Sequence, residues 1–304
     1  MLQSMEMKKD TRRGYIALII VSFFWGTTYV ASKIGTGYMP GLFVSGVRQF
    51  LSGLLMVTFF LCKGYSIPSW TDLKKISIQG LFLLCIANGL LTWAIEFISS
   101  GLAAIIAGLV PIFIALFSIL LTKSARITKW MFAGLLIGML GVCTIFYNYL
   151  GQLANKSFIL GISMALIATL SWSFGTVYTS KQKSTVSILF SVGLQMLISG
   201  IVLLIVCFST GKYVNLAQTP HNSWYALIYL IFFGSLLAYS AYVFAITKLP
   251  PTLVSVYAYI NPVVAVLLGW MLLREKMNVN MILGTLIILY GVYLVNREFK
   301  KQKA

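Results

Sequence analysis

Apolar runs of about twenty residues, separated by short polar connections, divide the chain from end to end. A run of that length can cross the hydrocarbon core of a bilayer as an α-helix, which satisfies its own backbone hydrogen bonds. The pattern predicts an all-α membrane protein with ten transmembrane helices, near residues 15–34, 41–61, 75–97, 101–121, 130–147, 158–178, 187–208, 224–247, 252–273 and 279–295.

Composition excludes a water-soluble domain and argues against a nucleic-acid partner. The chain is 59% hydrophobic and only 10% charged, which leaves too few polar residues to cover a surface in water. Its formal charge is +17, but the basic residues mostly lie between the apolar runs rather than in one patch. The expected partner is therefore the lipid bilayer, and the basic residues orient the chain in it.

Basic residues follow the second and fourth runs, whereas the connections after the first and third carry almost no charge. By the positive-inside rule this bias places both termini in the cytoplasm. The residues concerned are Lys63, Lys74, Lys75, Lys123, Arg126 and Lys129.

The second half of the chain repeats the plan of the first. Pro111 matches Pro262 at an offset of 151, and Gly134 and Gly141 match Gly284 and Gly291 at an offset of 150. We expect five-helix repeats at 15–148 and 157–297, between a cytoplasmic N-terminal segment at 1–14 and a basic cytoplasmic tail at 298–304. Five spans is an odd number, so the second copy enters from the opposite side. Such inverted-topology repeats place a substrate site near the midplane between the copies.

Glu96 and Arg48 are the candidate charge partners or coupling groups within the predicted spans. Glu96 shares a helix face with Asn88 and Thr92. It either binds a proton or a substrate ammonium group, or it reaches the headgroup region or pairs with Lys33. Arg48 either neutralises a carboxylate or holds the bundle together. The position that matches Arg48 in the second half is Gln195, so any charge at the site is asymmetric.

Aromatic and polar side chains recur in both halves and would suit a cavity for an amphipathic metabolite, although such stripes also serve as packing or interfacial belts. The candidate substrate-binding residues are Trp25, Thr28, Tyr29, Asn88, Trp93, Trp172, Tyr239, Tyr242, Tyr257 and Asn261.

The paired prolines are candidate hinges. Pro111 and Pro262 each remove a backbone donor and can expose a carbonyl to the cavity, and an ordinary packing kink is the alternative.

The sequence contains few other residue patterns that indicate chemistry. The sequence offers no phosphate-binding glycine loop, no metal-ligand spacing and no catalytic set, so we expect no cofactor, no metal, no ATP hydrolysis and no enzyme activity.

Several segments together resemble the EamA-type transporters of the drug/metabolite transporter superfamily. They are Trp25, Gly26 and Thr27 in the first run, Arg48 in the second, WAIEFISSGLAAIIAGLVPIF across the third and fourth, and YINPVVAVLLGWMLLREKMNVNMILGTLIILYGVYLV at the end. The resemblance implies two inverted five-helix repeats around a central cavity and alternating-access transport of small metabolites. One departure is visible, because the acid usual after the fourth helix is Ala125 here, whereas Glu275 keeps it after the ninth.

We therefore expect a secondary transporter in a bacterial inner or plasma membrane that exports an amino acid or related compound, with possible proton coupling. Alternatives are a multidrug, importer or exchanger variant, or a membrane scaffold or sensor. Facing polar groups around a cavity would favour transport, and a solid apolar interface would favour a scaffold. The glycine faces can pack within one chain or between two, so the oligomeric state stays open.

Overall fold

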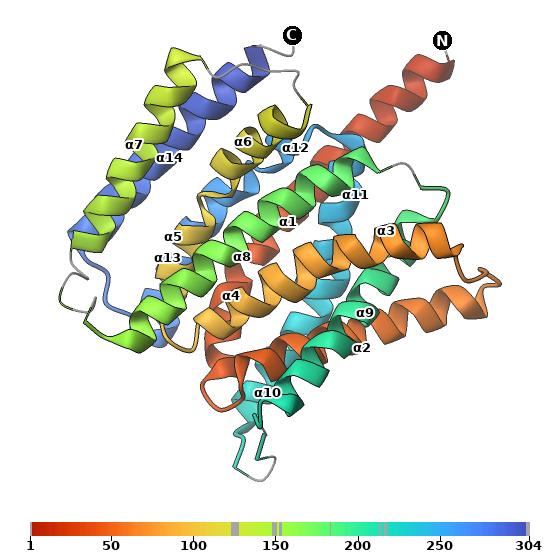
Figure 1. The fold of residues 1–304 in the computed structure, drawn as a ribbon, viewed down its shortest axis with the longest axis horizontal. Helices are drawn as coiled ribbons and strands as arrows, with labels where there is room; N and C mark the ends of the chain where they lie inside the picture. The colour runs from red at the N-terminus through yellow and green to blue at the C-terminus, as the bar shows by residue number, and fades with distance from the viewer. Residues whose placement is uncertain are drawn as a thin grey trace.

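The computed structural model describes residues 2–122, 128–147, 151, 154–182, 184–212, 214–215 and 218–301. Ala125 and residues 302–304 of the expected tail lie outside them. In this part of the chain the ordered elements are all helical (Figure 1). The first copy contains α1 (Leu2–Thr36), α2 (Gly41–Cys62), α3 (Trp70–Gly80), η1 (Leu81–Asn88), α4 (Gly89–Ala94), α5 (Ser100–Ala107), α6 (Val110–Thr122) and α7 (Lys129–Tyr147). The second contains α8 (Lys156–Lys181), α9 (Ile188–Ser209), α10 (His221–Tyr229), η3 (Leu230–Tyr239), α11 (Ser240–Lys248), α12 (Pro251–Val254), α13 (Tyr257–Leu273) and α14 (Val279–Lys301).

Ten apolar helical segments account for the ten predicted spans. Within the described residues, seven are long and apolar enough to cross a membrane, namely Arg12–Thr36, Gly41–Cys62, Trp70–Ala94, Ser100–Leu121, Lys156–Lys181, Ile188–Ser209 and His221–Lys248. Three shorter apolar helices follow the same plan, at Lys129–Ile145, Ile260–Leu273 and Val279–Val295. The first helix begins earlier than expected, since α1 starts at Leu2 and includes most of the segment 1–14.

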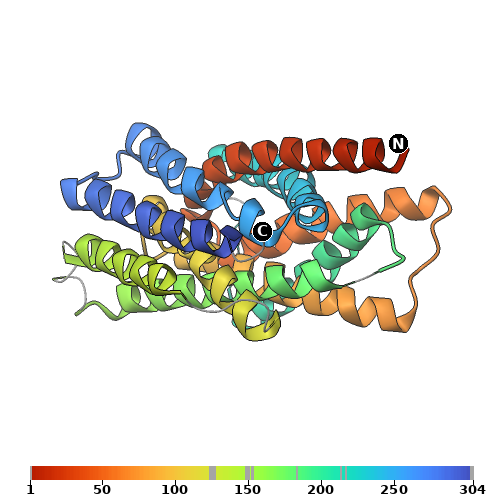
Figure 2. The ribbon, with the colours of Figure 1, turned by 90° about the horizontal axis from the view of Figure 1, so that it is seen from above.

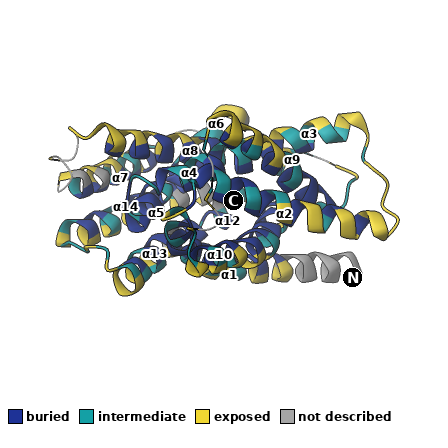
Figure 3. Ribbon diagram, turned by 90° about the horizontal axis from the view of Figure 1, so that it is seen from below, coloured by how far each residue is buried: buried dark blue, intermediate teal, exposed yellow. Residues whose placement is uncertain are grey.

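The outer surface is apolar, as a lipid-facing surface must be. Exposed residues cover the outward faces of the helices, and buried residues gather between them (Figure 3). Large apolar side chains are among the exposed ones, including Ile19, Met139, Ile205 and Leu286. Water would disfavour such a surface, whereas lipid chains accommodate it.

The same two spans are irregular in each copy. The third and eighth contain the π-helical turns η1 and η3. The fourth is interrupted between α5 and α6, and the ninth between α12 and α13. Because π-helical turns and discontinuous helices often mark functional sites in membrane proteins, these four spans direct attention to the region that they enclose.

The two most extensive helix pairings join counterparts from the two copies, α2 with α9 and α7 with α14 (Figure 1). In both Figure 1 and Figure 2, α7 and α14 lie side by side at one edge of the molecule. A Cβ on Gly134 would lie 2.7 Å from the Gly291 carbonyl oxygen, and one on Gly141 would lie 2.7 Å from that of Gly284. Only glycine permits this approach, so the four repeated glycines pack within the chain.

The contacts between counterparts are reciprocal. Gly134 and Gly284 are equivalent positions in the two copies, and so are Gly141 and Gly291. Gly134 lies against Gly291, and in the same way Gly284 lies against Gly141. The same holds in the other pair, where Gly53 lies against Leu197 and Gly200 lies against Phe50. A two-fold axis generates reciprocal contacts of this kind. Because residue numbers rise along one helix as they fall along its partner, the paired counterparts run antiparallel.

Candidate functional site

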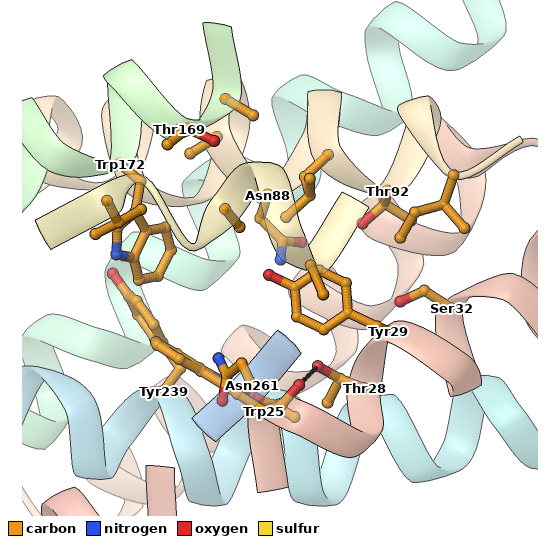
Figure 4. A pocket seen from close by; sticks show the side chains of 18 of the residues that line it. Trp25, Thr28, Tyr29, Ser32, Asn88, Thr92, Thr169, Trp172, Tyr239 and Asn261 are labelled. Carbon is orange, nitrogen blue, oxygen red and sulfur yellow. Dashed lines mark hydrogen bonds between the residues drawn. The ribbon is translucent and has the colours of Figure 1, made fainter. Parts of the chain in front are cut away.

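A cavity of about 90 Å³ lies between the two copies. It is lined from the first copy by α1, α2, η1, α4, α5 and α6, and from the second by α8, η3 and α13. Figure 4 shows side chains of both copies around it. The structure brings nine of the residues singled out from the sequence into this lining: Trp25, Thr28, Tyr29, Arg48, Asn88, Trp172, Tyr239, Tyr257 and Asn261.

One side of the cavity is an aromatic cluster formed by Trp25, Trp172 and Tyr257. The ring centroid of Trp25 lies 5.1 Å from that of Trp172, 5.1 Å from that of Tyr257 and 4.9 Å from that of Tyr242. Trp25 also donates from Nε1 to the Gly234 carbonyl at 3.2 Å, which ties α1 to η3. These contacts hold the rings in place across the boundary between the copies.

Tyr242 lies behind this cluster and not in the lining. It is fully buried, and its hydroxyl pairs with Thr176 Oγ1 at 2.5 Å. Tyr242 therefore supports the rings of Trp25 and Trp172 from behind, and Tyr239, three residues earlier on the same side of the chain, reaches the cavity.

Trp93 is also outside the cavity. Thr92 faces the cavity, and the next residue of a helix points about 100° away. Trp93 packs against the cluster formed by Leu42, Leu203 and Cys207, and the Lys212 ammonium lies 4.5 Å from its ring centroid. The structure thus does not bring Trp93 together with the other candidates.

The polar side of the cavity contains residues that the sequence did not single out. Gln49 Nε2 and Ser45 Oγ both donate to Asn88 Oδ1, at 3.2 and 2.9 Å, and this fixes the amide of Asn88. Gln49 lines the cavity beside Ser32 and Thr169. One sequence signal could have found Gln49, since an amide next to Arg48 within an apolar run is an unusual pair of neighbours.

Arg48 is held across the boundary between the copies. It is 4% exposed, and its Nε donates to Ser235 Oγ of η3 at 2.9 Å. A Cβ on the neighbouring Gly234 would lie 2.9 Å from Arg48 Nη2, so the missing side chain there makes room for the guanidinium. No carboxylate pairs with Arg48 in the described part of the chain.

Glu96 lies away from the cavity. The helix α4 ends at Ala94, so the four-residue spacing that aligns Asn88 with Thr92 does not continue to Glu96. Its carboxylate accepts from the Gly41 amide and lies 3.8 Å from Lys212 Nζ. Lys33 Nζ donates hydrogen bonds to the carbonyls of Ile95 and Ile98, at 2.6 and 2.9 Å, just beside Glu96 in the sequence.

The prolines act differently in the two copies. Pro111 is the second residue of α6, just after the interruption, whereas Pro262 lies inside α13 without ending it. Each proline lacks the N–H that would bond to the carbonyl four residues earlier, at Ala107 and Ala258. Both of these alanines line the cavity. Equivalent positions of the two copies therefore place at the cavity a backbone carbonyl that receives no hydrogen bond from the residue four positions later.

The sequence model of the EamA-like transporter family matches residues 12–147 and 159–297, one match for each copy. The chain belongs to the EamA-like transporter family. This confirms the resemblance and explains the repeated architecture around the cavity.

EamA-like relatives are similar to this chain over nearly its whole length. The "Uncharacterized inner membrane transporter YedA" of Escherichia coli strain K12 is 35% identical over 92% of this chain and 89% of its own. The "Uncharacterized transporter YoaV" of Bacillus subtilis is 27% identical over 95% and 98%. A WAT1-related chloroplastic protein of Arabidopsis thaliana is 28% identical over 93% of this chain and 69% of its own. A crystal structure with 18% identity has a TM-score of 0.67 over 96% and 99%, a likeness of fold alone.

Glu275 caps a helix of the other copy. Its carboxylate accepts from the Ser100 amide and from Ser100 Oγ, both at 2.9 Å, and from the Gly101 amide at 3.3 Å. Arg274, with a φ of 54°, turns the chain so that Glu275 follows directly after α13. Glu275 therefore joins the end of α13 to the start of α5.

Proposed function

We propose that this EamA-like protein is a secondary transporter that exports a small organic metabolite, an amino acid or related compound. The observation that carries the proposal is the cavity between the two copies, lined by aromatic rings, amides and hydroxyls from both. A scaffold needs no such enclosure of polar groups, whereas a transporter needs a site that both copies share. The transporter names of the relatives support the same class.

The size of the cavity favours a small solute over a bulky drug. Drug-sized ligands occupy pockets of roughly 300–1,000 Å³, whereas this cavity has about 90 Å³. A multidrug transporter in the same conformation would need wide movement of the lining before binding. Import and exchange remain alternatives, since neither is opposed by the size of the site.

Alternating access fits the antiparallel pairing of counterpart helices. We place both termini in the cytoplasm, with the second copy inverted relative to the first, in the inner membrane named for the YedA relative. The start of α1 and the end of α14 lie at the same end of the molecule, which supports a common side (Figure 1). Rocking of the two copies about their glycine contacts would open the cavity to each side in turn.

Flux in liposomes tests the proposal. Purified protein should mediate saturable uptake and efflux of at least one labelled amino acid, with and without a proton gradient. Ala107→Leu would fill part of the cavity and should reduce this flux, while Ala133→Leu adds the same volume on α7, which contributes nothing to the lining. If both variants keep the wild-type flux, the solute passes elsewhere. Flux of bulky apolar cations alone would favour the multidrug alternative.

Proton coupling is a separate part of the proposal, with Glu96 as the candidate group. Glu96 forms an ion pair with Lys212 at one end of the third span, and a proton bound to the carboxylate would weaken this ion pair. Glu96→Gln should therefore remove the pH dependence of transport, and an unchanged pH dependence would exclude this residue as the coupling group.

A further inference from the structure

Charge in the cavity lining is one-sided. Arg48 is the one charged residue among the described residues that line it. The acidic side chains that the structure describes are those of Asp72, Glu96, Glu275 and Glu298, and none of them belongs to this lining. A buried cation without a counter-ion is costly, so an anionic group that enters the cavity gains from it.

The guanidinium of Arg48 has donors to spare. A guanidinium carries five N–H groups, and the described residues supply one acceptor, Ser235 Oγ, to Nε. The terminal nitrogens are thus left with the planar pair of donors that matches a carboxylate. Because Ser235 and Gly234 hold the group from the side of the second copy, its direction is set before a ligand arrives.

Two buried acceptors of the lining lack donors. Among the described residues, Gln49 Oε1 and Asn261 Oδ1 find no hydrogen-bond donor, and both side chains are less than a tenth exposed. Buried amide oxygens are normally paired, so these two mark places where a ligand can donate. The rings of Trp25 and Tyr257 in the same lining can additionally face a cation.

We propose that Arg48 binds the carboxylate of the transported solute, with Gln49 Oε1 and Asn261 Oδ1 accepting from its amino group. The inference rests on the proposed function and narrows the substrate class to small compounds that bear a carboxylate. Under it, an amine that lacks the carboxylate keeps the two amide acceptors but is repelled by Arg48 and leaves that charge without a counter-ion. The counterpart Gln195 takes no part, because it is absent from the lining and satisfied by protein groups.

Binding measured apart from flux tests the inference. The probes are glycine, alanine and leucine, their carboxamides, and the matching carboxylic acids without the amine. Quenching of tryptophan fluorescence in detergent reports on Trp25 and Trp172 of the lining. The wild-type protein should bind the amino acids tightest and the carboxamides weakest, by roughly tenfold to a hundredfold. Equal binding of acid and carboxamide, or no binding of any carboxylate, would overturn the inference.

Variants separate a binding role from a structural one. Arg48→Gln should abolish the preference for the carboxylate, and Arg48→Lys should keep part of it, because a lysine retains the charge without the planar pair of donors. Lys156→Gln removes one charge at the exposed start of α8 and should leave the preference intact. Arg48→Gln protein that folds and still prefers the acid would also overturn the inference. Preferential binding without flux would instead refute transport and leave the Arg48 site standing.

Discussion

Arg48 and Gln195 occupy equivalent positions in the two copies and have opposite surroundings. Gln195 donates to Gln79 Oε1 at 2.7 Å and accepts from Tyr239 Oη at 2.5 Å, so protein groups satisfy it. Arg48 has one protein acceptor and faces the cavity. The repeated backbone thus carries a residue bonded within the protein in one copy and a cavity-facing charge in the other.

The frame should be sensitive to the same change in either copy. Gly53→Ala and Gly200→Ala would each press a methyl group into the backbone of the facing helix, at Leu197 and Phe50. We expect each to lower the free energy of unfolding by about 3 kcal/mol, measured by thermal unfolding in detergent. Gly151→Ala, where a Cβ would meet nothing within 4 Å, is the control. Strongly unequal losses of unfolding free energy in the two variants would show that the two glycine contacts are not equivalent.

The variant Gln195→Leu tests the difference between Arg48 and Gln195. This change leaves Gln79 and Tyr239 without their partner, so stability should fall by about 2 kcal/mol. The preference for a carboxylate should stay as in the wild type. If the preference changes with Gln195→Leu, then Gln195 belongs to the site and the contrast with Arg48 is wrong.

The two copies also differ in the cap at the end of the fourth and ninth spans. Glu275→Gln removes the charge from the cap on α5 and should cost about 1 kcal/mol. As a control, Glu298→Gln removes a carboxylate that pairs with Lys301 within the same helix and should change stability little. Equal effects of the two changes would mean that Glu275 acts only as a surface charge.

The smallest expected effect concerns the residue that directs this cap. Arg274 adopts a left-handed conformation that glycine accepts without strain. Arg274→Gly should therefore raise thermal stability slightly, by about 0.5 kcal/mol, with Glu275 still in place. A loss of stability would indicate that the arginine side chain itself contributes contacts to the turn.

The sequence was sufficient for the spans because their signal is local. Length and hydropathy mark each helix, and the offsets of the prolines and glycines mark the copies. Most of the candidate residues singled out from the sequence also line the cavity, because polar groups such as Asn88 and Asn261 inside apolar runs have few other places to go.

What could not be predicted depends on packing between distant segments. Helical spacing put Glu96 on the face of Asn88, but α4 ends before that residue. Nothing near Tyr242 in the sequence shows that Trp25 and Trp172 would cover it. The capping of Ser100 by Glu275 joins residues 175 positions apart, and no local pattern announces such a contact.

The cap of Glu275 on Ser100 has no equivalent at the other end of the molecule. The position that matches Glu275 is Ala125, which has no carboxylate, and the position that matches Ser100 is Pro251, which has no N–H. If the two copies exchange conformations during a transport cycle, the two end states differ in this set of hydrogen bonds. The conformation in which these hydrogen bonds form would then be favoured, and the resting protein would open preferentially to one side of the membrane.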